Sequence, residues 1–221
     1  MKDLSVYEQL GIVIPGAGLL LGVLVLEPAI QPLFLGNGLS VGGLGLFIII
    51  AYALGHIVAA AGNVIDSLIW ACLGGMPSQW ARKPKNPIVS ESQRAAICRK
   101  ANSRHGIAVA TDVVVPASAW KHCFHVIYRD VMRNAPSTRI DGFNGSYGLN
   151  RGLAASCLLL LPLLWHKAPA DWEWWAAGLI AMSATYAFRM CRFGVHFARE
   201  VLIGFSLLPD PPGVPASAKE A

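Results

Sequence analysis

Long runs of apolar residues divide this chain, and they predict helices that cross a membrane. The longest run covers residues 41–73, VGGLGLFIIIAYALGHIVAAAGNVIDSLIWACL, and Asp66 is its one charged residue. About 20 residues of helix cross the hydrocarbon of a bilayer, at a rise of about 1.5 Å per residue. This run is therefore long enough to span a bilayer and to project beyond it.

Three more apolar runs complete the predicted set of spans, at residues 10–26, 152–165 and 174–188. The last run continues without a helix breaker to residue 208, which predicts one long helix that leaves the bilayer. A glycine-rich stretch, RIDGFNGSYGLNRG, leads into the third span. We therefore expect an all-α integral membrane protein with four transmembrane helices.

A polar segment at residues 77–151 separates two predicted hairpins, at 1–76 and 152–208, and is expected to form a mainly helical cytoplasmic domain. Ser90 and Gln93 have the spacing of a capping box before a helix, and Ser118 is expected to cap a second one. Residues 107–115 suit either a strand or a connector. The proline-rich tail at 209–221 is expected to be disordered.

The distribution of charge predicts the orientation. The chain has 18 Lys and Arg against 13 Asp and Glu, with a mean hydropathy of +0.48 and a pI near 9.1. Most of the basic residues lie between Arg82 and Arg151. By the positive-inside rule this segment and both termini are cytoplasmic, and we expect the inner membrane of a bacterium.

Polar residues within the second span are the main functional candidates. A polar side chain at membrane depth normally faces another helix, another subunit or water. The helical spacing suggests a polar face that lines a pore or contacts a neighbouring helix, made of His56, Asn63, Asp66 and Ser67. A purely structural role, in which these groups bond a neighbouring helix, remains the alternative.

Small residues on the first two spans predict close helix packing, within the chain or between copies of it. They are Gly18, Gly22, Gly55, Ala59 and Gly62.

Basic residues at the predicted membrane boundary are expected to contact lipid headgroups or a protein partner. They are Arg82, Lys83, Lys85, Arg99, Lys100, Arg151, Arg189 and Arg192. Nucleic acid is a weaker alternative, because these residues are scattered and few aromatic residues lie among them.

The motif KHCFH, with His122, Cys123 and His125, resembles a set of metal ligands, but two further ligands would have to come from elsewhere. We expect no metal and no cofactor. The common hydrolase and NTPase signatures are also missing from the sequence.

Together these features favour an oligomeric pore or membrane-perturbing effector, gated through its cytoplasmic domain. Antiviral defence is one setting that suits such a protein. Two alternatives remain: a membrane-embedded enzyme that acts on a lipid-soluble or membrane-proximal substrate, and an anchor that recruits a cytoplasmic protein.

Overall fold

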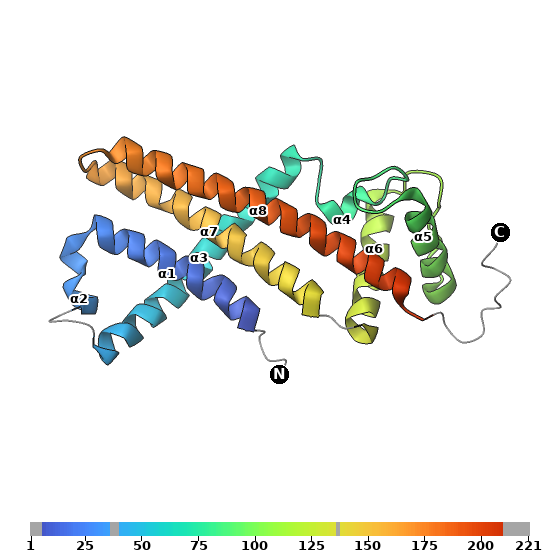
Figure 1. The fold of residues 1–221 in the computed structure, drawn as a ribbon, viewed down its shortest axis with the longest axis horizontal. Coiled ribbons are helices and arrows are strands. Elements are labelled where there is room, and N and C mark those ends of the chain that lie inside the picture. The colour runs from blue at the N-terminus through green and yellow to red at the C-terminus, as the bar shows by residue number, and fades with distance from the viewer. Residues whose placement is uncertain (1–5, 36–39, 136–137, 210–221) are drawn as a thin grey trace. The chain divides into compact units, whose positions relative to one another are not determined.

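A computed structural model describes residues 6–35, 40–135 and 138–209, and these residues form helices without any strand. The all-α class predicted from the sequence is confirmed. Residues 107–115 form an irregular connection between two helices, so the strand alternative is wrong. Figure 1 shows the arrangement of the helices. In chain order they are α1 (Val6–Leu26), η1 (Pro28–Ile30), α2 (Pro32–Leu35), α3 (Val41–Cys72), α4 (Pro77–Trp80), α5 (Glu91–His105), α6 (Ala117–Asn134), α7 (Thr138–Lys167) and α8 (Trp172–Leu207).

Two segments of the described chain are long and apolar enough to cross a membrane, Val41–Trp80 and Thr138–Lys167. A third is counted if Gly11–Leu26 and Pro28–Phe34, which are bent by 106° relative to each other, form one broken span. The chain is thus a candidate membrane protein with two or three spans by this criterion, where the sequence pattern predicted four. α8 does not meet this criterion.

The helices divide into two compact units. Met1–Cys72 and Asn144–Phe193 form the first, and Leu73–Phe143 and Gly194–Ala221 form the second. α7 and α8 each contribute residues to both units. These boundaries differ from the 77–151 segment suggested by composition, because residues 144–151 pack with the first unit and the end of α8 packs with the second.

Close backbone contacts hold α1 against its neighbours in the first unit. A Cβ atom placed on Gly16 would lie 1.9 Å from the Ala51 carbonyl oxygen, and one on Gly55 would lie 2.3 Å from the Ile12 carbonyl oxygen. α1 and α3 therefore cross with their backbones almost in contact. α7 approaches α1 in the same way, since a Cβ on Gly152 would meet the buried ring of Pro15 at 2.6 Å.

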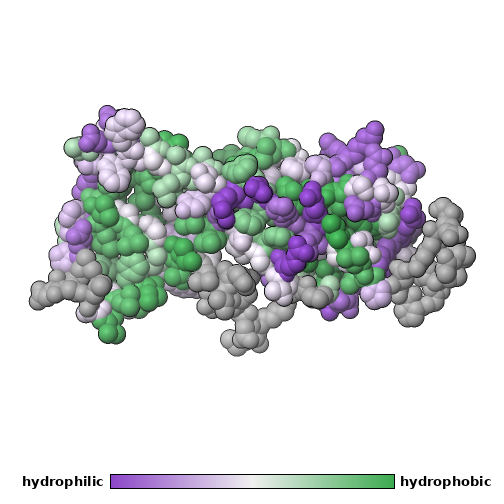
Figure 2. Space-filling model, viewed as in Figure 1, coloured by the Kyte–Doolittle hydropathy of each residue, from purple (hydrophilic) through white to green (hydrophobic). Residues whose placement is uncertain are grey.

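The outer surface of the first unit is strongly apolar. Among its exposed side chains are Val25, Ile49, Val64, Trp174 and Phe188, each more than half exposed. In Figure 2 the hydrophobic colour predominates on the visible face of α1 and α3. Such a surface suits contact with lipid, which supports membrane association of this unit.

The second unit has an ordinary buried core, formed by α5, α6 and the end of α8. Trp120, Ile127 and Phe205 are fully buried in it. α5 begins with the predicted capping box, in which Ser90 and Gln93 exchange hydrogen bonds. The prediction that Ser118 caps the next helix is wrong. α6 begins at Ala117 after Pro116, whose carbonyl accepts the hydrogen bond from the Trp120 amide.

Arg94 joins α5 to the irregular segments of the second unit, which are residues 81–90 and 106–116. Its side chain is only 1% exposed. Its guanidinium donates hydrogen bonds to the carbonyls of Ala81 at 2.8 Å, Thr111 at 2.5 Å and Arg82 at 3.0 Å. The Ala81 and Thr111 carbonyls thereby gain a donor, and the Arg82 carbonyl, which also accepts from the Val115 amide, gains a second one.

Candidate functional site

α3 carries two neighbouring stripes that differ in burial. Gly55, Val58 and Gly62 are buried within the first unit, and Asp66 is half-buried on the same side. His56, Asn63 and Ser67 are exposed. A helix turns by about 100° per residue, so positions 11 residues apart lie nearly above one another. Asp66 therefore lies above Gly55, and Ser67 lies above His56.

The predicted polar face is thus divided by the structure. His56, Asn63 and Ser67 remain together, whereas Asp66 belongs to the stripe of small residues that packs inside the unit. The grouping of Asp66 with the other three residues is therefore corrected. The offset of one residue between the two stripes is visible in the sequence, but it does not tell which stripe a neighbouring helix covers.

Asp66 lies in a hydrogen-bonded group with two aromatic residues. The Tyr147 hydroxyl, from α7, donates to Oδ1 of Asp66 and accepts a hydrogen bond from Nε1 of Trp70 at 2.8 Å. Both Asp66 and Trp70 lie on α3. A carboxylate near the boundary of a membrane span thereby gains a neutral donor, which reduces the cost of placing it against apolar surroundings. Tyr147 could not be recognised from the sequence as a site residue, because nothing in its local pattern marks a contact with Asp66, 81 residues away.

Arg151 lies one turn beyond Tyr147 on α7, and its guanidinium lies 5.9 Å from the centre of the tyrosine ring. The stem of the arginine crosses α3 where Gly62 leaves room for it, since a Cβ on Gly62 would lie 3.2 Å from Cγ of Arg151. The Nε atom is buried and has no hydrogen-bond partner in the described chain. A buried donor without an acceptor costs about 1–3 kcal/mol.

A cavity of about 290 Å³ adjoins this arginine. Residues from three helices line it: Gly11, Ile12, Ala59, Asn144, Gly145, Tyr147, Gly148, Arg151 and Gly152. Ala59, which the sequence analysis assigned to helix packing, is therefore also a wall of this cavity.

The exposed stripe of α3 has few contacts with the rest of the described chain. The His56 ring packs edge-on against Tyr52, with 4.8 Å between ring centres. The Ser67 hydroxyl donates to the Asn63 carbonyl at 2.9 Å, within the helix. Ile57 and Val64 flank the stripe and are about 60% exposed. These polar groups consequently occur on an apolar, outward-facing surface.

The predicted packing glycines of α1 differ in their surroundings. A Cβ on Gly22 would lie 2.4 Å from Cδ1 of Leu160 on α7, so any larger residue here requires the Leu160 side chain to move. A Cβ on Gly18 would meet no atom within 4 Å. Within the described chain, Gly18 therefore makes no close helix contact.

The predicted basic contact residues differ in exposure. Lys83, Lys85, Arg99, Arg189 and Arg192 are exposed, whereas Arg82 is half-buried.

Lys100 is occupied within the second unit, which changes its assignment as a headgroup contact. Its ammonium donates to the carbonyls of Ser206, at 3.0 Å, and Leu208, which are left without partners at the end of α8. Arg104 completes the cap by donating to the Pro209 carbonyl at 2.8 Å.

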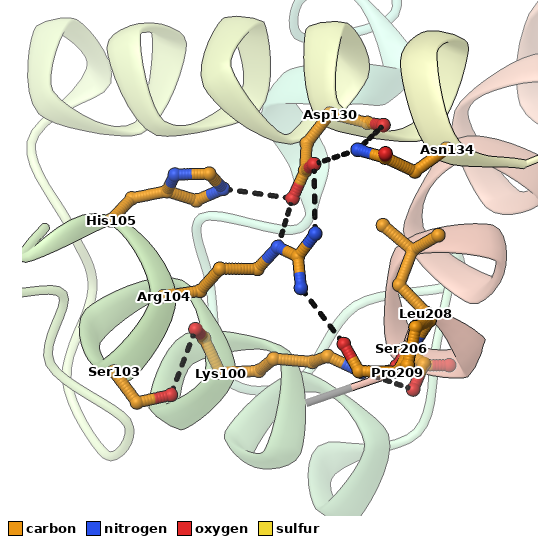
Figure 3. A network of polar contacts seen from close by, with 9 residues as sticks. All are labelled: Lys100, Ser103, Arg104, His105, Asp130, Asn134, Ser206, Leu208 and Pro209. Carbon is orange, nitrogen blue, oxygen red and sulfur yellow. Dashed lines mark hydrogen bonds and ion pairs between the residues drawn. The ribbon is translucent and has the colours of Figure 1, made fainter. Parts of the chain in front are cut away.

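Asp130 organises the same region, as Figure 3 shows. Its carboxylate accepts hydrogen bonds from Arg104 Nε at 2.5 Å and from Asn134 Nδ2 at 2.6 Å, and it lies 3.0 Å from His105 Nε2. Burial alone would raise the pKa of Asp130, but hydrogen bonds from Arg104 and His105, the charge of Arg104 and the Asn134 amide hold it below its ordinary value of 3.8. The group joins α5 to α6 and, through Arg104, to the end of α8.

The KHCFH motif does not converge on a metal position. His122 and His125 are exposed on α6, and Cys123 is buried. Burial, followed by the neighbouring Cys98, raises the pKa of the Cys123 thiol to about 11, so this residue is protonated and unreactive at neutral pH. Among the residues that the structure describes, no three His, Cys, Asp or Glu side chains are grouped as metal ligands.

Comparison of the chain with protein-family models, with curated proteins and with solved structures finds no match. The exposed stripe of α3 and the polar group around Tyr147 are the features of the described chain from which a function can be inferred.

Proposed function

We propose that this protein assembles in the membrane through α3 and that the His56–Asn63–Ser67 stripe of several copies borders a shared polar pathway. The observation that supports this proposal most directly is the exposure of all three residues on a segment long enough to span a membrane. An amide moved from water into hydrocarbon without a hydrogen bond costs roughly 4–8 kcal/mol. A second copy, or water between copies, removes this cost.

The length of the stripe supports a pathway in preference to an isolated contact. Tyr52, His56, Asn63 and Ser67 extend over four turns of α3. At about 1.5 Å per residue they cover roughly 22 Å, against roughly 30 Å for the hydrocarbon core of a bilayer. Copies of α3 arranged around one axis would then present polar groups through most of the membrane.

Our proposed topology has four crossings: α1, α3, the apolar part of α7 at 152–165, and α8 from about 174 to 188. The basic residues at Arg82–Arg151 and both termini then lie on the cytoplasmic side of a bacterial inner membrane. In this arrangement the second unit is cytoplasmic and is the part that receives a signal. Its partner there is a lipid surface or a cytoplasmic protein.

The test is membrane potential during induced expression, recorded with a potential-sensitive dye. We expect the wild-type protein to depolarise the membrane. His56→Leu and Asn63→Leu are expected to abolish depolarisation, while the amount of protein in the membrane and its oligomeric state stay the same. Ile57→Leu and Val64→Leu are the matched controls, because they alter exposed neighbours outside the stripe.

Depolarisation by all four variants would contradict a pathway along this stripe. Turnover of a lipid without depolarisation would favour the enzyme alternative. Retention of the biological effect after replacement of residues 1–76 by an unrelated anchor would favour a tether.

A further inference from the structure

The guanidinium of Arg151 is the starting point, because it is a charged group with an unused hydrogen-bond donor in the described chain. Its Nε atom is buried and makes no hydrogen bond, and no carboxylate of the described chain forms an ion pair with it. Asp66 is nearby in the fold, yet its partner is the Tyr147 hydroxyl. The charge lies over the face of the Tyr147 ring, 5.9 Å from its centre. Such an arginine is available to bind an anion.

The adjoining cavity offers space for that anion. Its volume of about 290 Å³ is near the lower end of small-molecule sites, which are roughly 300–1,000 Å³. Part of its wall is bare backbone, at Gly11, Gly148 and Gly152. A phosphate with its glycerol fits such a space, whereas two acyl chains would have to remain outside it.

The position of Arg151 along the chain indicates which anion reaches it. The next 14 residues, 152–165, carry no charge, so Arg151 ends the polar part of α7 at the edge of the apolar run. The cavity also contains Gly11, at the start of the uncharged part of α1. A basic residue at such an edge lies at the level of lipid headgroups.

We infer that the cavity between α1, α3 and α7 binds the phosphate of an anionic phospholipid, with Arg151 as the charged donor. A guanidinium presents parallel N–H groups that match the oxygens of a phosphate, and Nε–H is one such donor that has no other acceptor. This site is separate from the exposed stripe of α3. It is expected to bind lipid whether or not the protein conducts ions.

The experiment is native mass spectrometry of the full-length protein in a non-ionic detergent, with added phosphatidylglycerol. The measured quantity is the fraction of protomers that retain one lipid. We expect the wild-type protein to retain phosphatidylglycerol and Arg151→Gln to bind it at least about tenfold more weakly. Arg151→Lys is expected to be intermediate, because an ammonium keeps the charge and loses the paired donors. Arg129→Gln, at an exposed position on α6, is expected to bind as the wild type does.

A second variant tests the cavity without removing the charge. A Cβ on Gly148 meets no atom within 4 Å, so Gly148→Leu fills the cavity with little strain in the fold. We expect it to reduce lipid retention about as much as Arg151→Gln does. Gly142→Leu is the matched control, since it lies on the same helix in equally open space and does not line the cavity.

Competition with inorganic phosphate distinguishes a lipid headgroup from a soluble phosphate as the bound anion. We expect excess inorganic phosphate to leave bound phosphatidylglycerol in place. Displacement of the lipid by free phosphate, with Arg151→Gln unable to bind phosphate, would assign the site to a soluble anion and overturn the lipid assignment. Retention of phosphatidylglycerol within twofold of wild type by both Arg151→Gln and Gly148→Leu would overturn the site as a whole.

Discussion

The Trp70 indole donates a hydrogen bond to the Tyr147 hydroxyl at 2.8 Å, and that hydroxyl in turn donates to Asp66. The Tyr147 hydroxyl thus connects the end of α3 to α7 and gives the Asp66 carboxylate a hydrogen-bond donor within the first unit. Asp66 and Trp70 lie one turn apart on α3, whereas Tyr147 is 81 and 77 residues from them in the sequence. Their grouping is therefore a property of the fold and a sensitive place to test it.

Tyr147→Phe removes the hydroxyl and leaves both the Asp66 carboxylate and the Trp70 indole without this partner. We expect a loss of about 1–3 kcal/mol in stability, because a half-buried acceptor loses its donor. Thermal unfolding of the detergent-solubilised protein measures this loss. Tyr186→Phe is the control, since Tyr186 has no hydrogen bond to another residue in the described ranges. Equal melting temperatures for the two variants would contradict the role assigned to Tyr147.

The crossing of α1 and α3 predicts opposite effects of one substitution at two glycines on the same helix. Gly16→Ala places a Cβ against the Ala51 carbonyl and is expected to destabilise by about 1–3 kcal/mol or more. Gly18→Ala meets no atom, and it is expected to be neutral or to stabilise by up to about 1 kcal/mol through higher helix propensity. Melting temperatures in detergent compare the two variants. If Gly16→Ala is as stable as Gly18→Ala, the helices do not cross at this point.

Arg94→Lys tests how the irregular segments of the second unit are held. A lysine cannot reproduce the fork of donors that reaches Ala81, Arg82 and Thr111, so some of these carbonyls lose their partners. We expect a loss of about 1–3 kcal/mol. Limited trypsin digestion of the full chain is expected to show faster cleavage after Arg82 and Lys85, which are not followed by proline.

Arg99→Lys is the matched control for that digestion, because Arg99 is exposed on the same helix. Unchanged cleavage in Arg94→Lys would mean that the packing around these segments, and not the arginine, holds them.

Asp130 predicts an acid-sensitive contribution to stability. Its pKa in the folded protein is below the ordinary value of 3.8, so the folded state favours the ionised form. The resulting stabilisation is fully present above about pH 5 and is lost as the pH falls through 3.8 and below, where the unfolded state binds the proton first. Asp130→Asn is therefore expected to lower the melting temperature at pH 7 and to change it much less at pH 3.

Asp112→Asn provides the comparison for this pH series, since Asp112 is exposed. A difference between wild type and Asp130→Asn that stays constant from pH 7 to pH 3 would show that the effect is steric and does not depend on ionisation.

The sequence predicted local features well because local chemistry determines them. Ser90 and Gln93 are three residues apart, so their reciprocal cap was predictable, and the long α8 was predictable from the absence of a breaker. The start of α7 at Thr138 was not predictable from the sequence, because the helix runs through several glycines, which have low helix propensity. Tertiary packing outweighs that propensity.

Long-range contacts account for the other differences between the predicted and the observed roles of residues. The sequence located Asp66 and Arg151 as polar groups near apolar runs, but it could not pair Asp66 with Tyr147 or reveal that Arg151 borders a cavity. Similarly, Lys100 was predictable as a basic residue and not as a cap for carbonyls more than 100 residues away. Such pairings depend on which helix faces cover each other.

Cysteine cross-linking in native membranes tests self-association through the exposed stripe of α3 most directly. The background carries Cys72→Ser, because Cys72 is exposed. Asn63→Cys places a thiol on the stripe, and Val64→Cys places one on the neighbouring exposed face as a control. Our account predicts that mild oxidation converts Asn63→Cys to a disulfide-linked dimer much faster than Val64→Cys. A protein that stays monomeric in both variants, or that cross-links equally through both positions, would contradict it.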